Sequence, residues 1–265
     1  MITMNVAKQI LIEDNNMKKL CAFLLAFFYK KSEAINALLN ALNVEPEIFY
    51  VRTFISEIIV QRLQSNLSLL SEHVARFVFL MNMLQNNGNM NDTFLQDMHF
   101  VEAYKKIFPS CYFDVYNGEE EATIEVPLFS LQKSDYILND NGLIDITQSV
   151  YAWMEAEIMQ KGRYNCKFNK LPYIITIAVD IEMSSLEIFE AIRFQNVHDD
   201  TQKSLAWSIH SLILQDQDEY RILIHMQDAE WQHLCSSDIP ANREIESKDL
   251  TKCPGRLKMI IYKAK

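Results

Sequence analysis

The hydrophobic period of the sequence changes near Pro109, and this change constrains the fold more than any other feature of the chain. Between about Lys18 and Leu84, apolar residues recur every three or four positions, which is typical of amphipathic helices. After Pro109, short β-branched or aromatic runs alternate with turn-forming residues, which is typical of strands. The sequence therefore predicts an α+β fold, with a helical N-terminal lobe to residue 108 followed by a mostly antiparallel sheet.

Individual elements can be predicted from the same patterns. Residues 111–116 and 122–129 flank an acidic, turn-like segment and are expected to form a hairpin. Asp145 is expected to begin a helix that runs to about residue 159, and Asp92 is expected to cap another helix. Four further strands are predicted at residues 173–182, 204–214, 220–226 and 257–263.

The charge balance argues against nucleic-acid and membrane partners. The chain has 25 Lys and Arg residues against 35 Asp and Glu residues, a net charge of -10, which repels phosphate backbones and anionic lipids. Its longest apolar run, residues 20–29, is about half of the ~20 residues that a transmembrane helix needs. We therefore expect this run to be a buried helix, and we expect neither a nucleic acid nor a membrane as partner.

The cysteines indicate a reducing compartment and no metal site. Five of them are spread widely along the chain, and no two form a CxxC pair. The N-terminus does not have the pattern of a secretory signal. The sequence also lacks a glycine-rich phosphate-binding loop. We expect free thiols, a location in the cytoplasm or nucleus, and no metal or cofactor.

Several segments of the C-terminal half, taken in order, resemble the ubiquitin-specific protease family of deubiquitinases. Residues 170–182 are similar to the central strand of that family, and residues 204–214 are similar to the strand that follows it. Residues 219–234 look like the next hairpin, with Trp231 in its tryptophan position, and residues 255–265 look like the closing strand. The resemblance implies a papain-like cysteine-protease fold, in which a helical lobe carries the nucleophile and a β lobe supplies the histidine.

The resemblance also implies a position for the nucleophile, Cys21, at the head of an apolar helix. Lys19 and Leu20 replace the polar residues of the family's cysteine box, and leucine cannot donate the hydrogen bond that stabilises an oxyanion. A helix N-terminus would lower the pKa of Cys21 and favour a nucleophilic role. The alternative interpretation of Cys21 is a small apolar residue of the core.

The histidine of the family is missing from its expected position. Glu219 stands there instead, and a carboxyl group with an ordinary pKa of about 4.3 is a poor acceptor for a thiol proton. The orienting residue is changed too, because Ser236 and Ser237 stand where the family has acidic or amide residues. Cys21, Glu219 and Ser236 are therefore the positions of a degenerate triad, and the sequence predicts no catalytic residue.

Two other histidines are close to Glu219 in the sequence, namely His225 and His233. Strand alternation puts His225 on the same face as Glu219, but about 20 Å along the strand at ~3.3 Å per residue. That distance is too long for His225 to replace the missing base directly. Each histidine is more simply explained as part of a strand.

The resemblance predicts one domain, residues 1–265, with a thumb-like helical lobe (1–108) and a β lobe of reduced fingers and palm (109–265). Cys166 matches half of one CxxC pair of the zinc-binding fingers in that family, and its partner is absent. A shortened, metal-free hairpin is therefore expected.

These observations favour a catalytically inactive ubiquitin-specific-protease-like domain that acts as a protein-interaction or scaffold module within a complex. Its partners would be proteins, with ubiquitin or a ubiquitin-like protein among the candidates. Two alternatives stay open: an active cysteine deubiquitinase or isopeptidase that uses Cys21 in a rearranged site, and an unrelated α+β interaction domain. The phenylalanine-rich helices, which include Phe49 and Phe79, are expected to bury a large core and to leave an apolar remainder for a partner.

Overall fold

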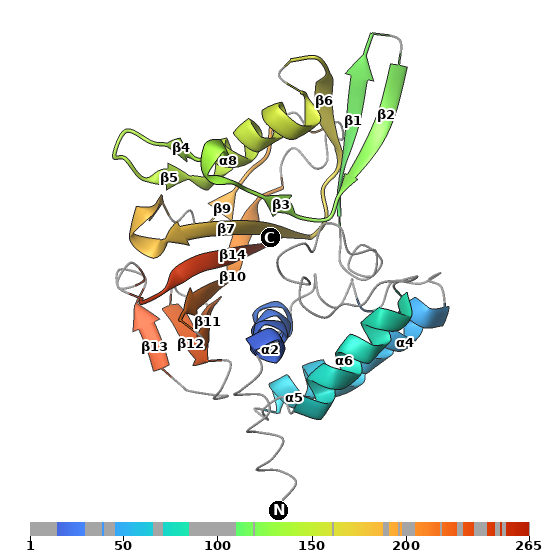
Figure 1. The fold of residues 1–265 in the computed structure, drawn as a ribbon, viewed down its shortest axis with the longest axis vertical. Coiled ribbons are helices and arrows are strands. Elements are labelled where there is room, and N and C mark those ends of the chain that lie inside the picture. The colour runs from blue at the N-terminus through green and yellow to red at the C-terminus, as the bar shows by residue number, and fades with distance from the viewer. Residues whose placement is uncertain are drawn as a thin grey trace, which may run out of the picture. The chain divides into compact units, whose positions relative to one another are not determined.

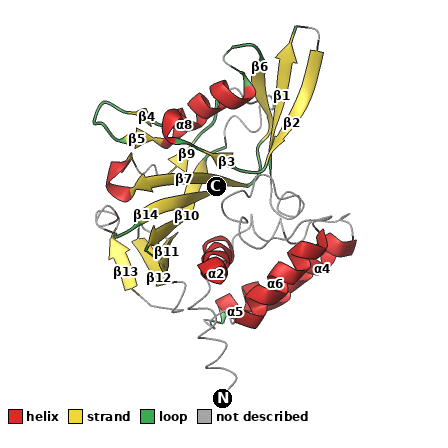
Figure 2. Cartoon of the chain, in the orientation of Figure 1, coloured by secondary structure: helices red, strands yellow, loops and turns green. Residues whose placement is uncertain are grey.

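The structure is a computed structural model, and Figure 1 gives the element labels. It describes residues 15–29, 39, 46–65, 71–84, 110–118, 120–160, 162–187, 191–195, 197, 205–217, 219–226, 230–235, 243–246, 250 and 253–264. The predicted helix that begins at Asp92 lies outside these residues. Both helices and strands are well represented (Figure 2), so the predicted α+β class is confirmed.

The chain folds into two compact units, and each unit is built from two separate stretches of sequence. Unit 1 contains Met1–Phe108 and Ser211–Leu250, and unit 2 contains Pro109–His210 and Thr251–Lys265. The assignment of residues 1–265 to a single domain stays a prediction.

The described helices of unit 1 all precede residue 85. They are α2 (Asn15–Phe28), α4 (Pro46–Phe54), the π-helix η1 (Ile55–Val60), α5 (Gln61–Gln64) and α6 (Ser71–Leu84). The backbone keeps right-handed helical angles at Phe54 and Val60, so α4, η1 and α5 continue from one to the next without a break. Helix α4 packs against α6 (Figure 1).

Helix α2 is buried on every side along most of its length. All nine side chains from Leu20 to Phe28 are buried, and the helix contacts both β11 and α6. A helix that is apolar all round belongs in an interior rather than at a surface. The prediction of a buried helix at residues 20–29 is therefore confirmed.

The strands of unit 1 form an antiparallel series. It contains the second part of β10 (Trp207–Asp216), then β11 (Glu219–His225), β12 (Glu230–Cys235) and β13 (Arg243–Glu246), each paired with the next. The turn from β10 to β11 is two residues long, because Asp216 pairs with Glu219. Gln217 takes a positive φ of 55° in this turn, as tight hairpin turns require.

Unit 2 contains three groups of strands. The first is the order β2 (Glu120–Val126), β1 (Cys111–Asn117), β6 (Asn165–Lys170). The second is β14 (Arg256–Ala264), β7 (Ile174–Glu182), β3 (Phe129–Ser130), and the third is β4 (Ile137–Leu138), β5 (Ile144–Asp145), β8 (Leu186–Glu187). Strand β9 (Ala191–Ile192) pairs with Trp207 and Ser208 at the start of β10. These pairings are antiparallel except β3 with β7 and β5 with β8.

The helical segments of unit 2 lie both before and after β5 in the sequence. They are α8 (Ile146–Trp153), the π-helix η4 (Met154–Ile158), and two short 3₁₀ turns, η3 (Lys133–Asp135) and η5 (Met183–Ser185). Asp145 caps α8, since its carboxylate accepts a hydrogen bond of 2.9 Å from the backbone N–H of Gln148. The predicted start of this helix at Asp145 is confirmed.

An aromatic cluster fills the interior of unit 2. The ring of Phe168 lies 4.6 Å from Phe113 and 5.0 Å from Phe194, and Phe194 lies 5.8 Å from Trp207. The indole N–H of Trp207 donates to the carbonyl oxygen of Pro172 over 2.9 Å. Tilted and edge-on rings are the favoured arrangements of packed aromatic residues.

Candidate functional site

Cys21 lies in the middle of α2, and not at its head. The helix begins at Asn15, which places Cys21 six residues, or about 9 Å at 1.5 Å per residue, from the first residue. The influence of a helix N-terminus falls off within the first turn. The expectation that Cys21 stands at the head of the helix is therefore wrong, because the helix starts earlier than the apolar run does.

The surroundings of Cys21 disfavour the thiolate. Its side chain is 1% exposed, and burial raises the pKa of the Cys21 thiol to about 12. The direction is opposite to the one that a helix N-terminus would give, and the burial agrees with the alternative interpretation of Cys21 as a small apolar residue of the core. Burial of Cys21 thus disfavours the thiolate form, which is the form that acts as a nucleophile.

Two hydrogen bonds connect α2 to the strands of unit 1. The Ser211 hydroxyl on β10 donates to the carbonyl oxygen of Ala26 over 2.7 Å in a fully buried position. The Gln232 amide on β12 donates to the hydroxyl of Tyr29, just after the helix, over 3.1 Å. These contacts hold the helix that carries Cys21 as a structural element of the interior.

Glu219 is the first residue of β11 and is partly exposed. It lies opposite Asp216 across the hairpin turn, so two carboxylates face each other there. Arg221 compensates part of this charge through a 2.8 Å ion pair with Asp216. The position that the family resemblance assigns to a base is thus part of a charged hairpin end.

The third position of the degenerate triad, Ser236, lies outside the described residues, as does Ser237. His225 lies at the far end of β11 from Glu219, and its ring packs edge-on against Trp231 at 5.0 Å. His233 lies within β12, opposite Leu223. The separation of His225 from Glu219 along one continuous strand is as the sequence predicts.

No group of three or more His, Cys, Asp or Glu side chains that could hold a metal ion occurs in the described part of the chain. Cys166 is half-buried on β6, opposite Val115 of β1, and burial raises its pKa. Among the helices in the described ranges, none has the length and apolarity to cross a membrane.

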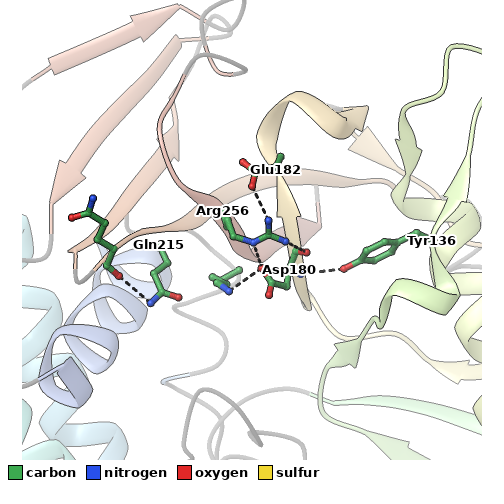
Figure 3. Close-up of polar contacts among 7 residues, drawn as sticks. Tyr136, Asp180, Glu182, Gln215 and Arg256 are labelled. Carbon is green, nitrogen blue, oxygen red and sulfur yellow. Dashed lines mark hydrogen bonds and ion pairs between the residues drawn. The ribbon is translucent and has the colours of Figure 1, made fainter.

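The polar cluster that sequence reasoning missed lies on β7 and β14 (Figure 3). The Asp180 carboxylate accepts from Nε of Arg256 at 2.6 Å and pairs with Nζ of Lys258 at 2.8 Å. Arg256 also pairs with Glu182 at 2.7 Å, and the backbone N–H of Asp180 donates to the hydroxyl of Tyr136. A clue was present in the sequence, since acids at alternate positions of one strand and cations at alternate positions of another can face each other.

The electrostatics of this cluster indicate a structural role. Burial by itself would raise the pKa of Asp180, but hydrogen bonds from Lys258 and Arg256, together with their charges, outweigh it and lower the pKa. Two acids and two cations balance each other, so the cluster offers no uncompensated charge to a ligand. The Asp180 and Arg256 side chains are about half exposed, which limits the stabilisation that they supply.

An exposed apolar surface occurs on the helices of unit 1. Phe49 and Tyr50 of α4 are 58% and 64% exposed, and Phe79 of α6 is 53% exposed. We call these three residues the aromatic face. The guanidinium of Arg76 lies 5.2 Å from the centroid of the Phe79 ring. Phe49 and Phe79 are thus part of the apolar remainder that the phenylalanine-rich helices were expected to leave outside the core.

No protein-family model matches the sequence, and no curated protein matches it. Two solved structures match the chain at low sequence identity. One is a yeast SAGA DUB module with an Sgf73 mutant (TM-score 0.45, 10% identity), and the other is the SAGA Ubp8/Sgf11/Sus1/Sgf73 DUB module (TM-score 0.43, 8% identity). The matches cover 89% and 91% of this chain, which spans 65% and 66% of the matched chains.

Proposed function

We propose that this chain is a catalytically inactive domain with a papain-like, ubiquitin-specific-protease-like fold, and that it works as a protein-interaction or scaffold module. The observation that carries the proposal is the burial of Cys21 in α2, with a pKa of about 12. Thiol catalysis needs an accessible thiolate and a base to form it. The position that the resemblance assigns to the base holds Glu219, whose carboxyl group is poorly suited to that task.

The aromatic face supports the interaction role. Phe49, Tyr50 and Phe79 are all more than half exposed, on two helices that contact each other. Aromatic residues and arginine are enriched at the energetic centres of protein interfaces, and Arg76 stacks on Phe79. We infer that a protein partner covers this surface, and ubiquitin or a ubiquitin-like protein is the first candidate to test.

The thiols support a reducing location. Cys21, Cys111 and Cys166 are free thiols, as is usual for proteins of the cytoplasm or nucleus. We include such a location in the proposal.

The test of inactivity uses ubiquitin whose C-terminus carries a vinyl sulfone and, separately, a fluorogenic ubiquitin amide. We expect neither a covalent adduct nor hydrolysis. Glu219→His is expected to remain inactive as well, because a restored base does not expose Cys21. A ubiquitin adduct that Cys21→Ser abolishes and the matched variant Cys166→Ser retains would overturn the proposal.

The test of the scaffold role compares wild type with a triple alanine variant of the aromatic face. Each is expressed in the native source, purified and weighed by native mass spectrometry. We expect a stoichiometric protein partner with wild type and its loss with the variant, while circular dichroism shows an unchanged fold. A monomeric wild-type protein without a copurifying partner would contradict the scaffold role, whatever the result with the ubiquitin reagents.

A further inference from the structure

Strand β2 lies at the edge of its three-stranded sheet. In the described chain it pairs with β1 alone, from Glu120 to Val126. Six of its seven residues are exposed. An edge strand carries backbone N–H and C=O groups along its outer side that can pair with another strand. At seven residues, β2 is as long as the strand that it pairs with.

The charge on this side of the sheet has one sign. Strands β1 and β2 together contain Asp114, Glu120, Glu121 and Glu125 but no lysine or arginine. The lysines of the sheet are on β6, with β1 between them and β2. Desolvation and then the charges of Glu121 and Asp114 raise the pKa of Tyr116. The outer edge is thus acidic and lacks an opposite charge on its own two strands.

The two faces of β2 differ in chemistry. One face carries Glu121, Thr123 and Glu125, which lie opposite the polar side of β1. Its polar groups are partly arranged already, because Thr123 donates to the buried Asp114 over 2.9 Å. The other face begins with Glu120 and continues with Ala122 and Ile124, which are in register with apolar residues of β1. Ile124 is 37% exposed. A strand added at this edge would meet acids on one face and apolar side chains on the other.

We propose that the outer edge of β2 binds an extended, basic segment of a protein partner as an added antiparallel or parallel strand. Alternate lysine or arginine side chains of that segment lie towards Glu121 and Glu125, and the intervening apolar side chains lie towards Ala122 and Ile124. Backbone hydrogen bonds with β2 contribute affinity for any extended segment, and the alternating side chains supply the specificity. This binding site goes beyond the proposed function and does not depend on catalytic inactivity, because an active protease could have the same exposed edge at β2.

The negative charge of β2 disfavours pairing of its edge with β2 of a second copy of this chain. A second copy of β2 would bring glutamates against glutamates, and like charges on neighbouring strands are destabilising. Charged residues on edge strands commonly prevent such self-association. A basic strand converts the same repulsion into attraction, and this is the reason for assigning a basic partner.

The test uses a fluorescein-labelled nine-residue peptide of alternating lysine and valine with blocked ends, titrated with the full chain and followed by fluorescence anisotropy. We expect saturable binding. The double variant Glu121→Lys/Glu125→Lys should weaken it at least tenfold. The matched double variant Glu155→Lys/Glu157→Lys changes two exposed acids of η4 and should change the affinity less than twofold. Circular dichroism and thermal unfolding establish that each variant is folded.

A second peptide separates strand addition from simple charge attraction. It has the same side chains but carries N-methyl groups on alternate amides along the edge that faces β2, so it keeps its charge and loses its hydrogen-bond donors. Which amides of the peptide face β2 depends on whether it binds parallel or antiparallel to that strand. We therefore use two versions of this peptide, one methylated on odd residues and one methylated on even residues. We expect one of them to bind at least tenfold more weakly than the parent peptide.

Several results would overturn the proposal. The first is the absence of saturable binding to the wild-type chain. The second is equal affinity for the parent peptide and both methylated peptides. The third is a loss of affinity in the η4 double variant that equals the loss in the β2 double variant. A dimer of the unliganded chain that Ile124→Lys dissociates would also overturn it, because the occupant would then be a second copy. None of these results depends on the reactivity of Cys21.

Discussion

Ser211 and Ala26 are 185 residues apart in the sequence, and the hydroxyl of the first donates to the backbone carbonyl oxygen of the second over 2.7 Å. Both residues are fully buried. The bond connects β10 to α2 inside unit 1. It is a short hydrogen bond between two elements that form the interior of that unit, so its removal should be measurable.

We predict that Ser211→Ala lowers the free energy of unfolding by about 1–2 kcal/mol, the usual effect of removing a buried hydrogen-bond partner. The matched control is Ser208→Ala on the same strand, where the hydroxyl makes only a 3.4 Å contact to Lys263. We expect a change below about 0.5 kcal/mol there. Urea unfolding followed by tryptophan fluorescence measures both changes in unfolding free energy. Equal losses for the two variants would show that the Ser211 hydrogen bond stabilises the fold no more than the Ser208 contact does.

The second prediction concerns thiol reactivity. Burial raises the pKa of Cys21 and of Cys111 far above that of an exposed thiol, while Cys166 and Cys253 are partly exposed. In native protein at pH 8, iodoacetamide should therefore modify Cys166 well before Cys21 and Cys111. Peptide mapping by mass spectrometry gives the order. Early modification of Cys21 would mean that α2 opens to solvent in the folded protein.

The third prediction concerns Asp180, whose pKa is lowered by Arg256 and Lys258. A carboxyl group with a lowered folded-state pKa stabilises the fold above its ordinary value of 3.8, and that stabilisation is lost as the pH falls through the folded-state pKa. Arg256→Gln should move the pKa of Asp180 back towards 3.8. Carbon-detected NMR titration of the carboxyl group measures this.

The control for that titration is Arg193→Gln, which removes an exposed cation from the same unit and should leave the Asp180 titration unchanged. The stability change caused by Arg256→Gln at neutral pH should stay below about 1 kcal/mol, because the pair is about half exposed and screened by solvent. A larger loss would mean that Arg256 contributes through packing in addition to charge.

The fourth prediction compares two phenylalanines of α6. Phe77 is fully buried and Phe79 is mostly exposed. Phe77→Ala should cost about 3–5 kcal/mol of unfolding free energy, the usual range for a buried aromatic residue. Phe79→Ala should cost less than about 1 kcal/mol. Thermal and urea unfolding test both, and a large loss with Phe79→Ala would argue that the aromatic face is already covered within the chain.

The sequence predicts those strands that are long enough to show the alternation of apolar and polar side chains. Strands β7, β10, β11 and β14 each have seven or more residues, and all four are predicted correctly. Strands β3, β4, β5, β8 and β9 have two residues each, too few to show alternation. Strand β6 was not predicted, because five of its six side chains are not buried and the hydrophobic signal is weak.

The candidate site was predicted less well than the fold. The type of residue at positions 21 and 219 can be read directly from the sequence, but burial depends on tertiary packing. Nothing in the apolar run of α2 distinguishes a cysteine near a helix N-terminus from one in the helix interior, since the helix begins before the run does. The exposure of Phe79 differs in this respect, because two residues along a helix rotate a side chain by about 200°, which puts Phe79 on the face opposite the buried Phe77.

The discontinuity of unit 1 has a consequence for synthesis of the protein. Helix α2 is translated about 200 residues before β11, the strand that it packs on. At roughly 5–20 residues per second, the ribosome needs about 10–40 s to make that strand. We expect protease to cleave within residues 20–28 when ribosome-bound chains are stalled near residue 180, and to be excluded once the chain has passed residue 250. Until then a segment of nine consecutive core residues has no sheet to cover it, which makes the nascent chain a natural client for chaperones that bind apolar helices.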